Sequence, residues 1–475
     1  MNRRALLLSA GAGAGCLAAA AVLGGCRPRP PTPASDPKTG APTVLESWLE
    51  RWLTAFNDPD LGVYKRFVET FAPTVRPYVD DDLSVREVTG GFELITSQVT
   101  GPQEITAIVK DRAWDRRSKV VLTASGPDTL DDIAFAGAPA EATIPRLDQA
   151  SALTAIETKI RDEARAGRFN GAVLVAREEQ VLYSAGHGAV DDGRELPVTP
   201  STRFCIGSMG KMFTAVATMQ LVEQGRLALA DPLARHLPDY ANKALAERVT
   251  VEQLLTHTGG TGDIFGPQYD ANADALKTPA DLVRFYGARE PVFEPGARWG
   301  YSNYGFVLLG AILERVTGQP YEVVFQERIF GPAGMKATSQ AFASSHATAI
   351  PYTGAGATGR KALAPYAGLP AGGGYSTVED LHAFVVALRR GALVSAATLA
   401  AMTAPKVVAG TSHWGLGLPV RTRNGATYYG HGGAAPGVNG DLAIYRDHTT
   451  VVLCNRGHPA AVVAADFMGA RLPVV

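Results

Sequence analysis

The sequence predicts an α+β protein whose large C-terminal domain forms one antiparallel sheet covered by helices. Strand-like runs open and close residues 151–475, whereas the middle of that stretch has helical patterns broken by glycine and proline. Ahead of it, residues 44–138 show apolar residues at helical spacing and then three alternating runs, which predict a smaller α+β domain. A chain of 475 residues is long enough for both domains.

The composition is that of a globular protein with a large core. Hydrophobic residues make up 46% and charged residues 19% of the chain, and the formal net charge is -1. A balanced charge gives no reason to expect a nucleic-acid partner. The histidines and cysteines do not have the spacing of metal ligands, so we expect neither a metal nor another cofactor.

Residues 1–26 have the layout of an export signal, with two arginines followed by an almost uncharged apolar run. The end of the run, Leu-Gly-Gly-Cys26, resembles a bacterial lipoprotein cleavage site, which implies a lipid on Cys26 and a membrane-anchored protein on the periplasmic or extracellular face. Cys16 is a weaker candidate for lipidation. Arg3-Arg4 also resembles a twin-arginine signal, so the export route stays open. The alternative is an uncleaved membrane helix.

Between the signal and the large domain, the sequence predicts a tether, a small domain and a linker. Residues 27–43 are rich in proline and read as the tether. In residues 44–138, helical patterns precede strand runs at 90–100, 103–114 and 118–126. This order resembles the NTF2-like, or SnoaL-like, cone fold, and we expect an accessory role for the domain. Residues 139–150 are the second linker.

In residues 151–475, strands are expected near both ends of the domain. The asparagine–glycine pair 424–425 predicts a tight hairpin turn between two of them. A final helix is expected at 459–472. The predicted strands are 171–178, 181–188, 413–420, 426–433, 440–447 and 449–457.

The segment FCIGSMGKMFTA, residues 204–215, places Ser208 three residues before Lys211 at the expected start of a helix. Side chains at that spacing lie roughly 60 degrees apart around a helix, so both can face one cleft. Burial lowers the proton affinity of a lysine, which can then serve as a base. The pair predicts a nucleophilic serine with its own base; the alternative is a helix cap followed by a solvated lysine.

Two later motifs favour the catalytic interpretation. Tyr301 and Asn303 form a Y-x-N pattern before a helical run, and His431-Gly432-Gly433 lies on an expected strand. The order S-x-x-K, Y-x-N, H-x-G resembles the serine β-lactamase and penicillin-binding-protein superfamily, and most closely class C β-lactamases, family VIII esterases and D-aminopeptidases. The resemblance covers nearly all of residues 151–475 and implies a β-lactamase/transpeptidase-like fold. His257, in a second H-x-G run, is expected to be structural.

The resemblance implies a role for each residue. Ser208 becomes acylated, while Lys211 and Tyr301 share proton transfer; which of them deprotonates Ser208 stays open. A tyrosine beside an ammonium group is expected to have a lowered pKa. The backbone N–H groups of Ser208 and Ala434 would hold the oxyanion.

Four residues are expected to contact the substrate or to support the site. Gly432 and Gly433 let the substrate approach the strand closely. Asn303 holds Lys211 or a substrate amide, or else caps the helix. His431 stands where related enzymes have lysine; a neutral imidazole there disfavours recognition of a substrate carboxylate.

These features predict an exported serine hydrolase acting through an acyl-enzyme on a small ester or a short peptide or amide containing a D-amino acid. A β-lactamase or D-alanyl carboxypeptidase activity is one alternative. A second is a non-catalytic module that binds cell-wall peptides or a partner. The sequence leaves the natural substrate and the oligomeric state open.

Overall fold

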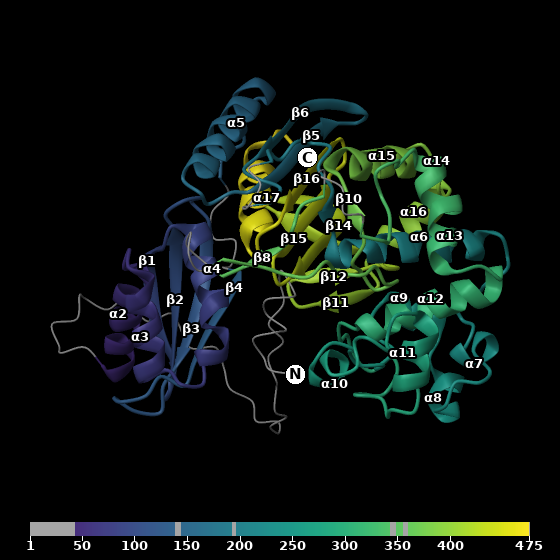
Figure 1. The fold of residues 1–475 in the computed structure, drawn as a ribbon, viewed down its shortest axis with the longest axis horizontal. Helices are drawn as coiled ribbons and strands as arrows, with labels where there is room; N and C mark the ends of the chain where they lie inside the picture. Colours follow the sequence, from purple (N-terminus) through teal and green to yellow (C-terminus); the bar gives the residue numbers. More distant parts are fainter. Residues whose placement is uncertain (1–42, 138–143, 192–195, 343–347, 355–359, 475) are drawn as a thin grey trace, which may run out of the picture.

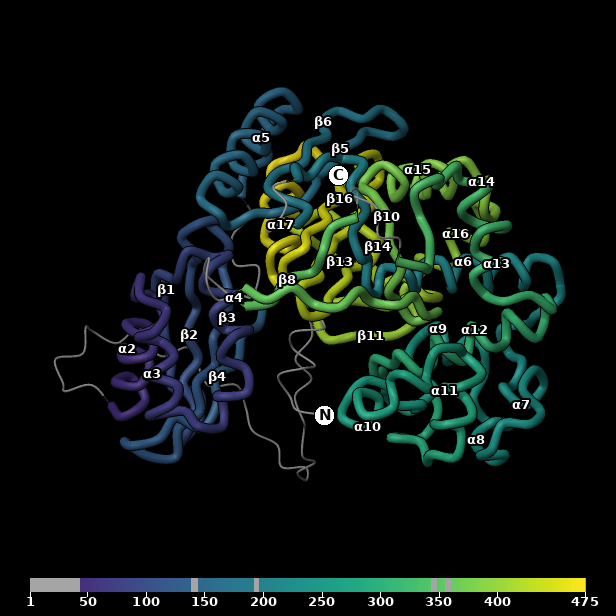
Figure 2. Tube along the Cα trace, viewed as in Figure 1, coloured from purple at the N-terminus to yellow at the C-terminus, as the bar shows by residue number. Residues whose placement is uncertain are grey.

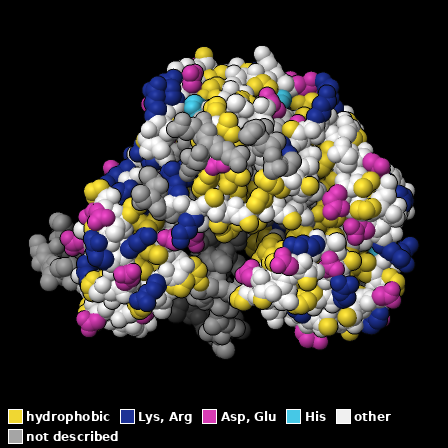
Figure 3. Space-filling view, in the orientation of Figure 1, with side chains coloured by type: hydrophobic (Ala, Val, Ile, Leu, Met, Phe, Trp, Pro, Cys, Tyr) yellow, Lys and Arg dark blue, Asp and Glu magenta, His cyan; other side chains and the backbone are white. Residues whose placement is uncertain are grey.

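The structure, a computed structural model, describes residues 43–137, 144–191, 196–342, 348–354 and 360–474. The predicted signal, Cys26 and almost all of the tether lie outside these residues. Figure 1 shows a smaller N-terminal domain beside a larger domain that contains the C-terminus. Basic and acidic side chains are interspersed over the face seen in Figure 3, as a formal net charge of -1 allows.

The N-terminal domain packs helices against a four-stranded antiparallel meander of order β1-β2-β3-β4. Its core is aromatic: Phe56 stacks on Phe92 with ring centres 5.2 Å apart. The three predicted strands are confirmed, and β4 is an addition, because the apolar residues in its short segment, DIAFAG, do not alternate with polar ones. Whether the domain is NTF2-like stays a prediction. Its elements are α2 (Val44–Asn57), α3 (Leu61–Phe71), η1 (Arg76–Tyr78), α4 (Val79–Thr89), β1 (Phe92–Gly101), β2 (Glu104–Asp111), β3 (Arg117–Thr123) and β4 (Asp132–Gly137).

The large domain is built on an eight-stranded antiparallel sheet of order β11-β12-β13-β14-β15-β16-β5-β6. The first strand after α5 pairs with the last strand of the chain, with Gly171 opposite Cys454, so both ends of the domain do meet in one sheet. Figure 2 traces these two segments, far apart in colour, side by side. The strands are β5 (Gly171–Arg177), β6 (Gln180–His187), β11 (Val407–Ala409), β12 (Ser412–Trp414), β13 (Pro419–Arg423), β14 (Ala426–Ala435), β15 (Val438–Ile444) and β16 (His448–Cys454).

The turn between β13 and β14 is as predicted, whereas one predicted strand is divided into two. Asn424 and Gly425 have φ values of 47° and 80°, the left-handed conformation that a two-residue hairpin turn needs. The expected single strand 413–420 is divided, because the chain turns at Gly417 against helix α6. A Cβ at Gly417 would lie 2.3 Å from the Cβ of Ala215.

Helices cover both faces of the large sheet. On β5, Val173 and Val175 belong to the core under α5 and α17, whereas Ala172 and Leu174 belong to the core around α6 and α12. Those four helices are α5 (Gln149–Arg165), α6 (Lys211–Glu223), α12 (Asn303–Thr317) and α17 (Ala460–Arg471). The remaining elements are β7 (Phe204–Cys205), η2 (Gly207–Gly210), α7 (Leu233–His236), α8 (Lys243–Arg248), α9 (Val251–Leu255), α10 (Pro267–Asp270), α11 (Pro279–Tyr286), α13 (Tyr321–Phe325), η3 (Gln326–Phe330), α14 (Gly331–Ala333), β8 (Tyr352–Thr353), β9 (Lys361–Ala362), β10 (Tyr375–Ser376), α15 (Val378–Arg389) and α16 (Ala396–Thr403).

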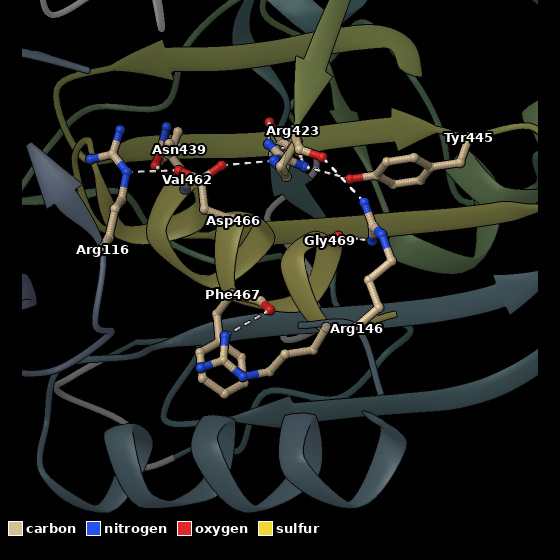
Figure 4. Close-up of polar contacts among 11 residues, drawn as sticks. Arg116, Arg146, Arg423, Asn439, Tyr445, Val462, Asp466, Phe467 and Gly469 are labelled. Carbon is tan, nitrogen blue, oxygen red and sulfur yellow. Dashed lines mark hydrogen bonds and ion pairs between the residues drawn. The ribbon is translucent and has the colours of Figure 1, made fainter. Parts of the chain in front are cut away.

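The N-terminal domain docks on the α17 side of the large domain. Arg116 donates to Asp466 on α17 over 2.7 Å, and the buried Arg423 donates to the other oxygen of the same carboxylate, also over 2.7 Å (Figure 4). Trp114 packs edge-on against Phe467, with ring centres 6.3 Å apart. A shared, partly buried carboxylate therefore joins the two domains to the core of the sheet.

The linker is held to the same side of the sheet. Arg146 donates to the carbonyl groups of Gly469 and Leu472 over 2.9 and 2.7 Å (Figure 4 shows the first). The side chain of Asn424 accepts from the N–H of Ile144 and donates to its carbonyl, each over 2.7 Å. The hairpin turn thus also anchors the linker.

Two further features of the described residues concern thiols and helix length. Cys205 and Cys454 are buried free thiols. In the described part of the chain, the helices are all too short or too polar to cross a bilayer.

We expect Asp466→Asn to lower the free energy of unfolding by about 1–3 kcal/mol, because the buried Arg423 would lose its charged partner at 2.7 Å and keep the longer contacts to Asp441 and Tyr445. Urea unfolding of both proteins measures the difference. Asp162→Asn is the control, since Asp162 makes only exposed ion pairs of 3.9–4.0 Å. This change should leave the midpoint of urea unfolding unchanged. Equal effects of the two changes would contradict the role given to Asp466.

Candidate active site

Ser208 stands out because its surroundings are buried and it is not. From Phe204 to Leu221 it is the one residue that keeps intermediate exposure. The serine lies in the 3-10 turn η2, and α6 begins at Lys211. Because α6 is buried on all sides from Lys211 to Leu221, it runs through the core, and η2 presents the Ser208 hydroxyl at its N-terminal end.

Glycines let three backbone segments meet around this hydroxyl. A Cβ at Gly433 on β14 would lie 2.0 Å from the carbonyl oxygen of Ile206, and one at Gly207 would lie 3.1 Å from the backbone nitrogen of Ala434. On the other side, a Cβ at Gly372 would lie 3.1 Å from the Cα of Ser208. Ser208 is thus held between β14 and the 372–374 loop, with Ala434 beside it as the oxyanion assignment requires.

Lys211 is fully buried, and acceptors surround its amine. Nζ donates to Ser208 Oγ over 3.2 Å and to Asn303 Oδ1 over 2.6 Å, and it also contacts the carbonyl oxygen of Ala371. Burial lowers the pKa of Lys211 to about 7, against the opposing charge of Asp263. The predicted proximity of Ser208 and Lys211 is confirmed, and near neutral pH the amine is partly unprotonated and able to accept a proton.

Tyr301 differs from the expectation in its pKa. Its ring lies against His257, with centres 4.4 Å apart, and Lys211 Nζ is 4.8 Å from the ring centre. Burial raises the pKa of Tyr301 well above its ordinary value, and contact with the Ser208 hydroxyl opposes this only in part. The expected lowering of the pKa is therefore wrong. A phenol that keeps its proton is suited to donate one, which leaves Lys211 as the better base.

Asn303 is the first residue of α12, and its side chain binds Lys211 instead of capping the helix. The N-cap is Ser302, whose side chain accepts from the N–H of Gly305 over 2.9 Å. The alternative that Asn303 caps the helix is therefore wrong. Its amide oxygen accepts from Lys211, and its amide nitrogen donates to both oxygens of Asp263, over 3.0 and 3.2 Å.

His431 is neutral, as expected, but its ring does not line an open cleft. Burial lowers its pKa to about 3, and Nδ1 donates to the carbonyl of Gly432 over 2.6 Å. The side chain is 4% exposed and packs against the rings of Trp414 and Tyr301, with centres 5.6 and 6.5 Å away. A substrate at this strand would meet the backbone of Gly432 and Gly433 before the imidazole.

Two neighbours of the site were not predicted as functional. His257 accepts from the N–H of Ser302 over 3.1 Å, which confirms its expected structural character but places it against Tyr301. Asp263 lies in a loop whose sequence carries no motif and is 40 residues from Asn303 in the chain. No local signal could connect the carboxylate with that amide.

The arrangement defines a class of protein. A half-exposed serine, a buried amine with a lowered pKa and a backbone cradle beside them are the parts of a serine hydrolase that forms an acyl-enzyme. In the described ranges, no three His, Cys, Asp or Glu side chains are grouped so that they could hold a metal ion.

Comparison with known proteins identifies the family. The family model described as Beta-lactamase matches residues 154–473. PbpX of Bacillus subtilis (strain 168), named as a penicillin-binding protein, is 30% identical over 60% of this chain and 70% of its own. Esterase EstB of Burkholderia gladioli is 33% identical over 43% of this chain, which spans only 56% of EstB. A D-stereospecific amidohydrolase from Streptomyces sp. is 30% identical, with a TM-score of 0.56, covering 69% of this chain and 99% of that one.

The chain therefore belongs to the β-lactamase family of serine hydrolases, together with esterase, amidohydrolase and penicillin-binding relatives.

We expect Gly433→Ala to reduce hydrolysis at least a hundredfold, because the added methyl group would push β14 away from Ser208 and misplace the oxyanion donors. The measurement is kcat/KM for a nitrophenyl ester, together with the thermal midpoint. Gly432→Ala is the matched control for folding, since its methyl group would come no closer than 3.4 Å to another residue. A thermal midpoint lowered equally by both changes would contradict this account of β14.

We expect kcat/KM for the same ester to rise with pH through about 7, because Lys211 accepts a proton only when it is unprotonated. Rates measured from pH 5 to 9 give this profile. In Lys211→Arg, kcat/KM should be at least a thousandfold lower at every pH, since a guanidinium does not lose its proton in this range. A flat acidic side of the wild-type profile would exclude Lys211 as the base.

Proposed function

We propose that this protein hydrolyses small esters, or amides that contain a D-amino acid, through an acyl-enzyme on Ser208. The observation that carries the proposal is the fully buried Lys211, whose amine lies 3.2 Å from the half-exposed Ser208 hydroxyl and has a pKa near 7. Nucleophile, base and oxyanion donors come from elements that pack tightly, so the site is organised before the substrate binds.

In the acylation step, Lys211 takes the proton of Ser208 while Oγ forms a bond to the substrate carbonyl carbon. The N–H groups of Ser208 and Ala434 stabilise the negative oxygen that develops. As the bond to the leaving group breaks, the protonated Tyr301 phenol gives its proton to the leaving oxygen or nitrogen. It regains a proton from the Lys211 ammonium, so the amine ends neutral.

In the deacylation step, water attacks the acyl carbonyl and its proton passes to Lys211. The bond to Ser208 Oγ then breaks, and Oγ recovers the proton. The products are a carboxylic acid and an alcohol or amine, and the enzyme returns to its starting state.

The proposed substrate class depends on His431 and on two relatives. Because His431 is neutral and buried, β14 offers no fixed positive charge to a substrate carboxylate. Relatives named as an esterase and as a D-stereospecific amidohydrolase support the choice of esters and D-amino-acid amides. The penicillin-binding relative makes β-lactams the second class to test.

We expect one fluorophosphonate adduct on the wild-type protein and none on Ser208→Ala, because a single hydroxyl is activated. Intact mass spectrometry of a form that starts after Cys26 measures this. A panel of nitrophenyl esters, D-amino-acid amides and a chromogenic cephalosporin then ranks the substrate classes. Full ester hydrolysis by Ser208→Ala would overturn the assignment. A folded wild-type protein that takes no probe would favour a binding module.

Export and lipid anchoring are also proposed, on the strength of the sequence alone. The apolar run that ends in Leu-Gly-Gly-Cys26 supports a lipid on Cys26, which would place the hydrolase at a membrane surface.

We expect the full chain to incorporate labelled palmitate in a bacterial host and to fractionate with membranes, because acyl chains anchor a protein at the bilayer surface. Cys26→Ser should lose the label, whereas Cys16→Ser should keep it. Retention of the label by Cys26→Ser would contradict the proposed lipidation site.

A further inference from the structure

Asp263 lies behind the active site, in the loop between α9 and α10. Its carboxylate accepts two hydrogen bonds from the Asn303 amide nitrogen, over 3.0 and 3.2 Å. It also accepts from the N–H of Ile264 over 2.7 Å. Arg289 donates to the carbonyl of Asp263 over 2.9 Å, so the loop is fixed from its outer side. The carboxylate is therefore held in one position against Asn303.

A carboxylate can only accept hydrogen bonds, and this determines how the Asn303 amide is turned. With the amide nitrogen bound to Asp263, the amide oxygen must face Lys211, and it lies 2.6 Å from Nζ. If the amide were reversed, an N–H group would point at Lys211 and oppose the ammonium form. Since Asn303 is 8% exposed, water has little access to take over either contact.

We infer that Asp263 is a positioning residue for the proposed hydrolysis: through the Asn303 amide it orients the Lys211 amine toward Ser208 and sets the charge that the amine feels. The inference rests on the proposed function of Ser208 and Lys211. Asp263 does not touch the reacting atoms and acts through Asn303.

The charge of Asp263 also changes the pKa of Lys211 in a predictable direction. A nearby negative charge favours the ammonium form, so Asp263 raises the pKa of Lys211 while burial lowers it. Two neutral imidazoles and one phenol lie around the amine: His257 after α9, His431 on β14 and Tyr301 before α12. The cation Arg421, on β13, is more distant. The described surroundings of the amine therefore make Asp263 the group whose removal should move the titration of Lys211.

Removal of the charge should shift the pH profile in a direction that loss of packing would not produce. With Asp263→Asn, the pKa of Lys211 falls, so the acidic side of the kcat/KM profile should move to lower pH by about 0.5–1 unit. The plateau value of kcat/KM at high pH should fall at least tenfold, since Lys211 is then a weaker base and the Asn303 amide is free to turn. Asp270→Asn is the matched control: Asp270 is an exposed aspartate on α10, close in sequence, and should change neither quantity.

A second measurement follows Lys211 without using catalysis. In protein labelled at the lysine Cε with 13C, the NMR signal that disappears in Lys211→Met reports the titration of this amine. Its midpoint should fall in Asp263→Asn by the same amount as the acidic side of the rate profile. This measurement is informative even when a variant is inactive, provided that its thermal midpoint shows that it is folded.

A double-mutant cycle tests whether Asp263 acts through Asn303. In an Asn303→Ala background, Asp263→Asn should have less than a threefold further effect on the plateau. An unmoved profile and NMR midpoint would overturn the inference, as would a full additional loss in the Asn303→Ala background. If Ser208→Ala keeps full activity while the NMR midpoint moves as expected, the proposed function fails and the positioning of Lys211 by Asp263 stands.

Discussion

The active site depends on the burial of one amine. Lys211 has no access to water, yet its nitrogen meets the Ser208 hydroxyl, the Asn303 amide oxygen and the Ala371 carbonyl. Burial without these acceptors would cost several kcal/mol, and acceptors without burial would leave the pKa near its ordinary value of about 10.4. The combination keeps the lysine in place and lowers its pKa to about 7. A base that works near neutral pH is thus a direct result of packing.

The rest of the large domain can be understood as the scaffold for this burial. Helix α6 is enclosed by apolar neighbours, and β14 and β15 pack against the η2 turn that carries Ser208. Glycines at 207, 372 and 433 permit the backbone approach that places Ala434 and the 372–374 loop beside Ser208. Strand β14 pairs with β13 on one side and β15 on the other, so it has little freedom to move away from the serine.

The N-terminal domain contacts the opposite side of the sheet. Its described contacts include Asp466 and Phe467 on α17 and a 2.7 Å ion pair between Glu87 and Arg360, whereas Ser208 lies on the α6 side. The contacts on α17 therefore lie on the other face of the sheet from Ser208. Arg423, buried between Asp441 and Asp466, transmits the attachment into the sheet itself.

Local sequence determined β5, β6, β14, β15 and β16, the Asn424-Gly425 turn and the S-x-x-K, Y-x-N and H-x-G positions, because side-chain periodicity and turn chemistry act between near neighbours in the chain. It also predicted that Ser208 and Lys211 share one cleft. Only the tertiary structure decided the raised pKa of Tyr301, the burial of the His431 ring, the capping of α12 by Ser302 and the contact between Asp263 and Asn303. These properties depend on desolvation and on contacts between segments far apart in the chain, and neither leaves a pattern in adjacent residues.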